Sequence, residues 1–578
     1  MNLYQNKIRI RTRILFFFFI IWITVIVFRL FKLQVIDHSQ LRLEVLRQNQ
    51  SMSIISPQRG SIYDRNGTIL ATSIPRESIF YSSLKDEPLP EQFKKIESLR
   101  SILNLSPKEL QSIEKRIERN EAFIWIRRKI EPALVEKIKK KEIKGIFFRE
   151  ENQRFYPQGK LAAHLIGRVN IDEAGQSGVE YRYNEVLQGK IGRCLILRDA
   201  KKRGYRLEVV NKPERGKDIY MTIDETIQYI AERELEKAVK ESRANWGTVI
   251  ISHPISGEIL AMANCPSWDL NHSFPVPHLI DYNRAIHHAF DPGSTFKIVT
   301  ASAAREFQRV GWEDKFDCSQ GSIYVAGKTI RDHKKFGILE FPEVIIHSSN
   351  VGTIQVGQRV GENYLYQTIK AFGFGEKTGI DLPAEASGIF RPLKNWTKIS
   401  LASLSIGYEI SVTPIQLLQA INIIANKGIL VPPIVVKMAC DSPQVYDFKE
   451  EVWHRARRVI SERTALEITS ILQRVVEVGT GMAAKIEGYE VAGKTGTAQK
   501  LDESFQGYSS SLHTASFVGF VPVKNPLISM VVVIDSPQGK YYGGQVAAPL
   551  FREIASQVLR YMGIKEKREF LQAIIAAK

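Results

Sequence analysis

The amino terminus carries the feature that most limits how this 578-residue chain can be arranged. An uninterrupted apolar run of 15 residues extends from Ile14 to Phe28, and the residues before it are basic, with no acidic residue among them. As a helix this run reaches about 22 Å, which is short of a hydrocarbon core of about 30 Å. The span becomes sufficient when residues 29–35 are added and the two basic side chains among them extend toward the headgroups.

No small-x-small cleavage site follows this run, so we interpret residues 14–35 as an uncleaved signal anchor rather than a signal peptide. The excess of basic residues before the anchor predicts that residues 1–13 form a cytoplasmic tail. The remainder, residues 36–578, would then lie outside the cytoplasmic membrane of a single-pass protein. Any chemistry in this remainder would take place away from cytoplasmic ATP.

The net charge of +18 raises the question of a nucleic-acid partner. The basic residues are spread along the chain and interleaved with acidic residues, and no recognised nucleic-acid-binding motif is present. We therefore expect a solvated basic surface near anionic lipid, and no nucleic-acid binding. The four cysteines are widely spaced without a CxxC pair, which argues against a zinc site and a disulfide framework and favours free thiols over a single disulfide.

The pattern of apolar and charged residues changes near residue 216, and this change divides the extracytoplasmic part into two predicted domains. Residues 36–215 alternate short strand-like runs with charged helical segments, and Asn66-Gly67 is a strong hairpin signal. No pattern there indicates chemistry, and we interpret His164 as structural. This first domain is therefore expected to be a spacer or docking module.

The second region, residues 216–578, has pairs of strand-like runs near both ends and helical patterns between them. This order predicts an α+β fold whose sheet is assembled from distant parts of the chain. Thr222 and Glu225 have the spacing of a capping box at the start of a helix. The predicted strand pairs are 247–252 with 258–263 and 515–523 with 528–534, and the helical patterns are 343–372, 411–427 and 462–479.

Ser294 and Lys297 form the first of three polar clusters in this region. Ser294 follows Pro292-Gly293 and begins a helix-compatible run, so the two side chains are expected on one helix face. A serine hydroxyl needs a base within hydrogen-bond reach, which a neutral lysine supplies, and a helix N-terminus offers N–H groups for an oxyanion. The pair therefore indicates acyl transfer, although the same spacing recurs elsewhere in the chain.

The other two clusters are Ser348-Ser-Asn350 and Lys494-Thr-Gly-Thr497. Each has a second interpretation. The first is also compatible with a simple helix cap. The second lies in a segment, Gly488 to Thr495, that matches the nucleotide-phosphate loop G-x-x-x-x-G-K-[ST]. Against a nucleotide site, the loop positions hold strand-forming residues, no helical stripe follows, and the signal anchor places the segment outside the cell.

Taken in order, the three clusters resemble the motifs of the penicilloyl-serine transferase family. The surrounding sequence resembles the class B penicillin-binding proteins over residues 14–565, most clearly in Arg59-Gly-x-Ile-x-Asp-Arg-Asn-Gly67, Gly178-Val-Glu180 and Phe290-Asp-Pro-Gly-Ser294. Within that family it is most similar to the septal transpeptidase of cell division, because of Phe290-Asp-Pro-Gly and the ending Ala547-Ala-Pro-Leu-Phe551. One departure is Glu409, where the family usually has a glycine, and this questions the geometry of the local turn.

The resemblance implies a transmembrane helix, an elongated β-rich pedestal or dimerisation-type domain over residues 36–215, and a transpeptidase domain over residues 216–578 with an antiparallel sheet flanked by helices. It also implies an activity, in which the serine attacks the carbonyl between the two terminal D-alanines of a peptidoglycan stem peptide and a neighbouring stem amine then takes the acyl group. The implied catalytic residues are Ser294 as nucleophile, Lys297 as base, Ser348 as proton relay and Asn350 as the support of Lys297 and the substrate amide. The implied binding residues for the terminal carboxylate are Lys494, Thr495, Gly496 and Thr497.

For Lys297 to act as a base near neutrality, its pKa must fall by about three units from roughly 10.4. Burial and the second cation of Lys494 both act in that direction. Backbone N–H groups of Ser294 and Thr497 would form the oxyanion hole. No metal or cofactor is implied, and β-lactams are expected to acylate Ser294 because they present the same carbonyl and carboxylate.

The implied partners are peptidoglycan stem peptides, β-lactam antibiotics, the cytoplasmic membrane, a membrane glycosyltransferase and division proteins. The implied location is the bacterial inner membrane, with the bulk of the chain on the periplasmic side. Three alternatives stay open at this point: an elongation-type class B transpeptidase, a membrane-anchored β-lactamase and a β-lactam sensor.

Overall fold

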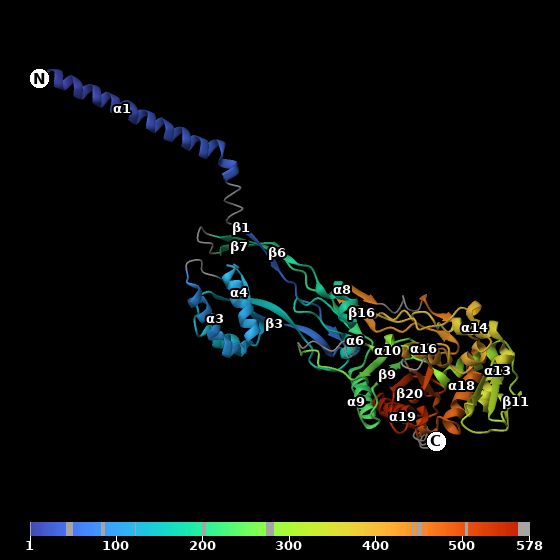
Figure 1. Ribbon diagram of the computed structural model, residues 1–578. Helices are drawn as coiled ribbons and strands as arrows, with labels where there is room; N and C mark the ends of the chain where they lie inside the picture. The colour runs from blue at the N-terminus through green and yellow to red at the C-terminus, as the bar shows by residue number, and fades with distance from the viewer. Residues whose placement is uncertain are drawn as a thin grey trace, which may run out of the picture. The chain divides into compact units, whose positions relative to one another are not determined.

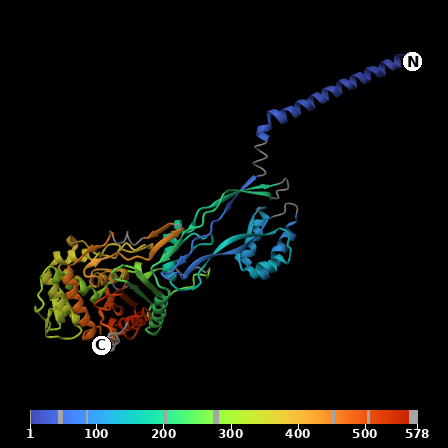
Figure 2. The ribbon, with the colours of Figure 1, turned by 180° about the vertical axis from the view of Figure 1, so that it is seen from behind.

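The computed structural model of the protein describes residues 2–41, 50–82, 87–121, 123–198, 204–272, 282–441, 444–447, 454–502 and 507–564. The chain forms two compact units. Unit 1 comprises residues 1–58 and 189–215, and unit 2 comprises residues 59–188 and 216–578. Figures 1 and 2 show their elements from opposite sides.

Unit 1 contains the apolar helix and a small sheet. Helix α1 (Asn2–Phe31) continues into a π-helical turn, η1 (Lys32–Ile36). The stretch Tyr4–Ile36 is long and apolar enough to cross a membrane, and none of its most apolar window is buried by protein. The sheet is antiparallel, in the order β1 (Gln50–Ile55), β6 (Gly192–Arg198), β7 (Gly204–Asn211), so two strands from far along the chain pair next to the first.

The amino-terminal part of unit 2 is a sheet covered on one face by helices. The long strand β3 (Ile69–Tyr81) pairs antiparallel with β4 (Ile124–Ile130) and with β5 (Ile146–Phe155). Three helices bury their apolar residues against it, and α3 and α4 are visible beside β3 in Figure 1. They are α3 (Leu89–Leu103), α4 (Pro107–Glu118) and α5 (Pro132–Lys139). Inward-facing Ile79 and Tyr81 of β3 contribute to this core, because alternate residues of a strand point to one face.

The rest of unit 2 is organised around a five-stranded antiparallel sheet. Its strands in spatial order are β10 (Ile259–Cys265), β9 (Trp246–Ser252), β21 (Ile528–Asp535), β20 (Gly507–Val521) and β19 (Ala492–Asp502). Both predicted hairpins, β9 with β10 and β20 with β21, are confirmed. The predicted α+β fold, with a sheet built from distant segments and flanked by helices, is confirmed as well.

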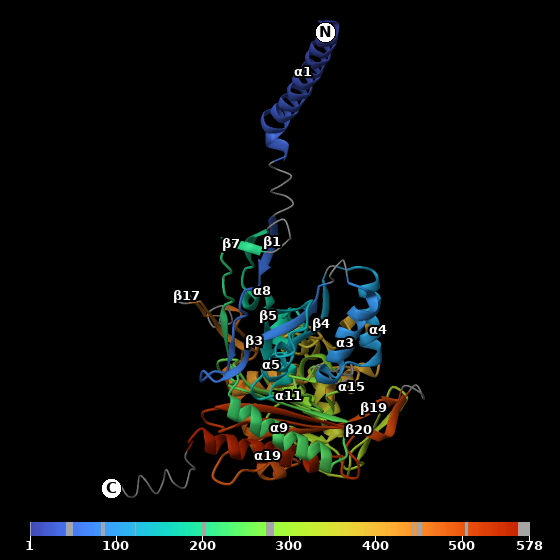
Figure 3. The ribbon, with the colours of Figure 1, turned by 90° about the vertical axis from the view of Figure 1, so that its left-hand side faces the viewer.

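Strand alternation divides the apolar residues of this sheet between two cores. Val532 and Ile534 of β21 pack with helices α9 (Glu225–Glu241) and α19 (Gly543–Tyr561), whereas Val531 belongs to the larger core on the other face. That second core contains helix α16 (Pro414–Ala425), which is buried along its whole length. Figure 3 shows α9 and α19 together on one side of β20. Every residue of β9 and β21 is buried, as expected for strands covered on both faces.

The start of α9 differs from the sequence prediction. Asp224 is the N-cap, and its carboxylate accepts hydrogen bonds from the N–H groups of Thr226 (3.0 Å) and Ile227 (3.2 Å). The predicted capping box between Thr222 and Glu225 is therefore wrong. The Thr222 hydroxyl instead donates to the carbonyl of Ile259 at 2.7 Å, a partner that the fold brings close and that local spacing does not reveal.

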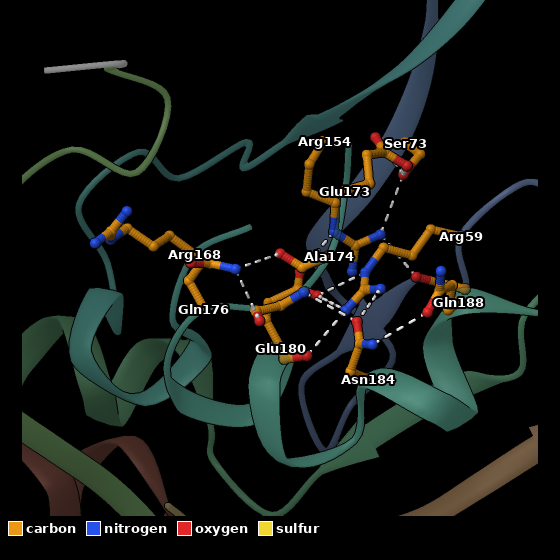
Figure 4. A network of polar contacts seen from close by, with 12 residues as sticks. Arg59, Ser73, Arg154, Arg168, Glu173, Ala174, Gln176, Glu180, Asn184 and Gln188 are labelled. Carbon is orange, nitrogen blue, oxygen red and sulfur yellow. Dashed lines mark hydrogen bonds and ion pairs between the residues drawn. The ribbon is translucent and has the colours of Figure 1, made fainter. Parts of the chain in front are cut away.

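A buried ion-pair network joins two of the motifs that carried the family resemblance. Glu180, on helix α7 (Gly178–Arg182), accepts hydrogen bonds from the Nε atoms of Arg59 (2.8 Å) and Arg154 (2.6 Å). All three side chains are at most 2% exposed. Figure 4 shows the network, in which Arg59 also donates to the Oδ1 atom of Asn184 at 2.9 Å. Glu180 therefore contacts two buried guanidinium groups directly, and the Glu173 carboxylate acts on the same two groups without a direct contact.

We expect Glu180→Ala to lower the free energy of unfolding by about 3–5 kcal/mol, because it removes the carboxylate that both buried guanidinium groups contact directly. The measurement is denaturant or thermal unfolding of the full chain in detergent. As a matched control, Glu150→Ala removes an exposed carboxylate from β5 and should change the free energy by no more than about 0.5 kcal/mol. Equal effects of the two substitutions would contradict the structural role of Glu180.

Candidate active site

Ser294 lies in a short 3-10 turn, η2 (Gly293–Phe296), directly before helix α11 (Lys297–Glu306). The backbone reverses at Gly293, whose φ is +53°, and the N–H of Gly293 donates to the carbonyl of Gly407 at 3.0 Å. The Ser294 side chain is half-buried, whereas Lys297 is completely buried. The structure therefore places Ser294 where a turn meets a helix, as its Pro-Gly neighbours indicated.

The Lys297 amine meets two residues of the second polar cluster. Its Nζ atom donates to the carbonyl of Ser348 (2.7 Å) and to Oδ1 of Asn350 (2.8 Å), and it lies 3.3 Å from Oγ of Ser348. The Nζ atom of Lys494 lies 3.0 Å from the same hydroxyl. The Ser348 hydroxyl is thus positioned between two buried amines that come from elements far apart in the sequence.

The segment that carries Ser348 and Asn350 is also a helix cap. Ser349 is the N-cap of α13 (Asn350–Val360), and its hydroxyl accepts a hydrogen bond from the N–H of Gly352 at 2.9 Å. Ser348 has a φ of +58°, a left-handed conformation that costs about 1 kcal/mol or more for a residue other than glycine. The two interpretations of the cluster are therefore compatible, because the middle residue caps the helix and its neighbours face Lys297.

Lys494 to Thr497 lie inside strand β19, which pairs with β20 at the edge of the sheet. The chain continues as strand from Thr495 to Asp502, where a nucleotide loop would begin its helix, so the nucleotide-loop interpretation is wrong. Gly496 permits a close approach to the Ser294 turn, since a Cβ atom there would lie 2.8 Å from Cγ2 of Thr295 and 2.4 Å from Oγ of Ser516. Thr497 Oγ1 accepts a hydrogen bond from the N–H of Gly543 (2.9 Å), and the hydroxyls of Thr495 and Thr480 are 2.9 Å apart.

Burial dominates the electrostatics of the two lysines. It lowers the pKa of Lys297 from 10.5 to about 7, against the opposing influence of Asp332 and the Cys318 thiol. Burial and the positive charge of Lys297 together lower the pKa of Lys494 well below its usual value. Near pH 7 a substantial fraction of the Lys297 amine is therefore neutral, and an amine in that state is able to accept a proton from a hydroxyl.

The departure at Glu409 does not remove the expected turn. Glu409 has a φ of +62°, the left-handed conformation that a glycine would adopt at less cost. Its carboxylate accepts a hydrogen bond from the Ser400 hydroxyl at 2.8 Å and forms an ion pair with Arg391. These contacts hold the residue in a conformation that is unfavourable for a glutamate alone.

Two residues of the site were not predicted from the sequence. Gly407 contacts the Ser294 turn through its carbonyl, and Asp332 accepts a hydrogen bond from the Ser349 hydroxyl at 2.7 Å. Gly407 lies two residues before Glu409 and has no local pattern that indicates a contact with Ser294, and no local pattern marks Asp332. Among the described residues, no group of three or more His, Cys, Asp or Glu side chains could hold a metal ion. All four cysteines belong to the described part of the chain, and none forms a disulfide.

Comparisons with known proteins agree with this architecture. Residues 247–556 match the penicillin binding protein transpeptidase domain, and residues 54–221 match the penicillin-binding protein dimerisation domain. Stage V sporulation protein D of Bacillus subtilis is 34% identical over 522 residues, covering 89% of this chain and 80% of that protein. Peptidoglycan D,D-transpeptidase FtsI of Escherichia coli K12 is 32% identical over 554 residues, covering 93% of this chain and 91% of that protein. The crystal structure of penicillin binding protein 3 from Mycobacterium tuberculosis, complexed with aztreonam, has a TM-score of 0.69 at 26% identity, covering 89% of this chain and 98% of that one.

The fold and the polar clusters therefore define a penicillin-binding protein with a transpeptidase domain. More narrowly, the match to the dimerisation domain and to relatives along nearly the full length shows that this chain belongs to the class B penicillin-binding proteins.

We expect the rate of acylation by a β-lactam to rise about tenfold per pH unit below pH 6 and to level off above pH 8. The reason is that the base form of Lys297 appears as pH rises through its pKa of about 7. The measurement is the rate of fluorescent-penicillin attachment to the full chain as a function of pH. A midpoint near 10, the usual value for lysine, would contradict this assignment.

Gly407→Ala is expected to slow acylation at least about tenfold, because a Cβ atom at this position would lie 2.1 Å from the carbonyl oxygen of Gly293 and displace the Ser294 turn. Gly67→Ala is a matched control. Its φ of +89° resembles the +82° of Gly407, nothing lies within 4 Å of its added Cβ atom, and it lies outside the transpeptidase match of residues 247–556. It should acylate at the wild-type rate, and a Gly407→Ala variant that does the same would show that contact with the Ser294 turn does not control acylation.

Proposed function

We propose that this chain is a penicillin-sensitive peptidoglycan D,D-transpeptidase that cross-links stem peptides through an acyl-enzyme on Ser294. The observation that carries the proposal is the meeting of Lys297 and Lys494 at the Ser348 hydroxyl, in the domain that matches the transpeptidase family. The names of the relatives, which include peptidoglycan D,D-transpeptidase FtsI, support the same substrate class.

Acylation would begin with attack of the Ser294 hydroxyl oxygen on the carbonyl between the two terminal D-alanines. Lys297 takes the hydroxyl proton, and the N–H groups of Ser294 and Thr497 stabilise the tetrahedral oxyanion. Ser348 then relays this proton from Lys297 to the departing amine, so the C–N bond breaks, the last D-alanine leaves and Lys297 is neutral again. In the second half, the amine of a neighbouring stem attacks the ester carbonyl and loses a proton to Lys297. The ester C–O bond then breaks, and the Ser294 oxygen takes this proton to become a hydroxyl again.

Lys494 would bind the terminal carboxylate of the donor stem, with Thr495, Gly496 and Thr497 on the same strand. In the empty site, burial and its neighbour lower the pKa of Lys494. An arriving carboxylate favours the ammonium form of Lys494, and this positive charge in turn disfavours a proton on Lys297. Substrate binding would thus increase the fraction of Lys297 that is neutral and able to act as the base. Asn350, whose Oδ1 atom accepts from Lys297 at 2.8 Å, would also contact the substrate amide.

Membership of the same family also supports a membrane topology, domain boundaries and a cellular role for the chain. We propose that residues 1–13 are cytoplasmic, that residues 14–35 span the bacterial inner membrane, and that the bulk of the chain lies on the periplasmic side. The boundaries of residues 36–215 as a pedestal domain and residues 216–578 as the transpeptidase domain belong to this proposal. The likeness to FtsI supports septal synthesis as the cellular role, with a membrane glycosyltransferase and division proteins as partners.

No specific observation favours any of the three alternatives, which are an elongation-type transpeptidase, a membrane-anchored β-lactamase and a β-lactam sensor. A β-lactamase or a β-lactam sensor does not require the dimerisation domain that residues 54–221 match. An elongation-type transpeptidase would have the same domains and the same site, and it would differ from a septal enzyme in the stage of wall growth that it serves. Depletion of a septal enzyme blocks division and gives filaments, whereas loss of an elongation enzyme gives rounded cells.

The decisive test is the intact mass of the full chain after β-lactam exposure. We expect a single adduct that persists for many minutes in the wild type and is absent in Ser294→Ala, because only Ser294 carries the ester. Ser302→Ala is the matched control, since Ser302 is a buried serine of α11 whose hydroxyl donates to the carbonyl of Ile298. An adduct that survives in Ser294→Ala would refute the nucleophile, and rapid turnover in the wild type would indicate a hydrolase.

A further inference from the structure

Asp332 supports the Ser348–Asn350 segment from a separate part of the chain. It directly follows strand β13 (Lys328–Arg331), which forms a hairpin with β12 (Ser322–Val325). The Oδ1 atom of Asp332 accepts hydrogen bonds from the backbone N–H groups of Asn350 and Val351, the latter at 3.1 Å. Its Oδ2 atom accepts one from the Ser349 hydroxyl at 2.7 Å.

These contacts satisfy the backbone at the start of α13. The first N–H groups of a helix have no partner within it, and an anion is favourable at that end. Asp332 takes the N–H groups of Asn350 and Val351, and the Ser349 hydroxyl takes that of Gly352 at 2.9 Å while donating to Asp332. Two side chains from different elements therefore fix the same turn.

The same hairpin also orients the Asn350 side chain. The Nδ2 atom of Asn350 donates to the carbonyl of Arg331 at 2.9 Å, which leaves its Oδ1 atom to accept from Lys297 at 2.8 Å. Backbone and side chain of Asn350 are thus both held by neighbouring residues of one hairpin. A shift of this hairpin would move the acceptors that surround the Lys297 amine.

Several charged or titratable groups act on Lys297. Lys494 faces it from β19 and disfavours a second positive charge. Asp332 has the opposite effect and favours the charged form of the Lys297 amine. The Cys318 thiol, which follows β11 (Lys315–Asp317), acts in the same sense as Asp332. His333, next to Asp332, has a lowered pKa, caused chiefly by burial and in part by the charge of Lys297. Asp332 is the carboxylate among these groups.

We propose that Asp332 is a positioning residue for acyl transfer, holding Ser348 and Asn350 in the arrangement that surrounds Lys297 and supplying a negative charge near the Lys297 amine. The proposal rests on the function assigned above to Ser294 and Lys297. It separates two contributions of one carboxylate, which are the hydrogen bonds at the start of α13 and the charge near the amine. The two can be tested with different substitutions.

Asp332→Asn retains an oxygen acceptor and removes the charge. We expect it to acylate within about tenfold of the wild type at pH 8–9 and to move the midpoint of the pH–rate profile to lower pH by about half a unit to one unit, because a lost negative charge disfavours the protonated amine. Asp332→Ala removes both contributions and should slow acylation about 100-fold on the plateau at pH 8–9, as a misplaced catalytic group does, with the midpoint moved to lower pH as in Asp332→Asn. Its thermal unfolding midpoint should stay within a few degrees of the wild type.

Asp317→Asn is the matched control, because Asp317 is an exposed carboxylate on the neighbouring strand β11 that accepts from Ser319. It should leave both the rate and the midpoint unchanged. All measurements use fluorescent penicillin and the full chain in detergent between pH 5.5 and 9.5. The intact-mass adduct on wild-type Ser294 is recorded first, so that failure of the proposed function is seen separately.

Two results would overturn the role of Asp332. One is an Asp332→Asn variant whose midpoint is that of the wild type, which suffices even if Asp332→Ala does not fold. The other is an Asp332→Ala variant that folds and acylates within about threefold of the wild type.

Discussion

The structure depends on burying two lysine amines against one serine hydroxyl. Taking an ammonium ion out of water costs several kcal/mol. If Lys297 and Lys494 were both protonated, they would also repel each other, because both lie within 3.3 Å of the Ser348 hydroxyl oxygen. The cost is reduced because burial favours the neutral amines and because the carbonyl of Ser348 and the amide of Asn350 accept from Lys297. A surface site would leave both lysines protonated, so enclosure by three separate elements is what creates a base.

That enclosure explains the architecture of the surrounding domain. Lys297 comes from a helix, Ser348 from the turn before another helix, and Lys494 from a strand at the edge of the sheet. The sheet places β19 next to β20, which in turn pairs with the central strand β21. Gly496 and Gly407 allow backbone contacts with the nucleophile turn that a side chain would prevent. Elements far apart in sequence are therefore held within hydrogen-bond distance by a rigid core on both faces of the sheet.

The parts that the sequence predicted are those encoded locally or by family motifs. Ser294 and Lys297 are one helical turn apart, and the two hairpins of the sheet alternate clearly, so both could be read from the chain. The meeting of Ser348 and Lys494 with Lys297 followed only from the resemblance, because no local rule relates positions so distant. Asp332 and the Thr222 hydroxyl escaped prediction because their partners are backbone groups supplied by tertiary contacts. The capping residue of α9 is a different case, because Asp224 bonds to the nearby N–H groups of Thr226 and Ile227 and the prediction placed the cap two residues too early.

The place of β19 at the edge of the sheet has a consequence for the behaviour of the protein at high density. An unpaired strand edge is a template for another extended chain, and natural sheets protect such edges with bulges among other devices. Strand β19 has this device, because its pairing with β20 shifts between Gln499 and Leu501. The irregular end of the strand is a poor template for a second copy of the enzyme, whereas the regularly paired part from Lys494 to Thr497 keeps the extended backbone that an incoming peptide needs.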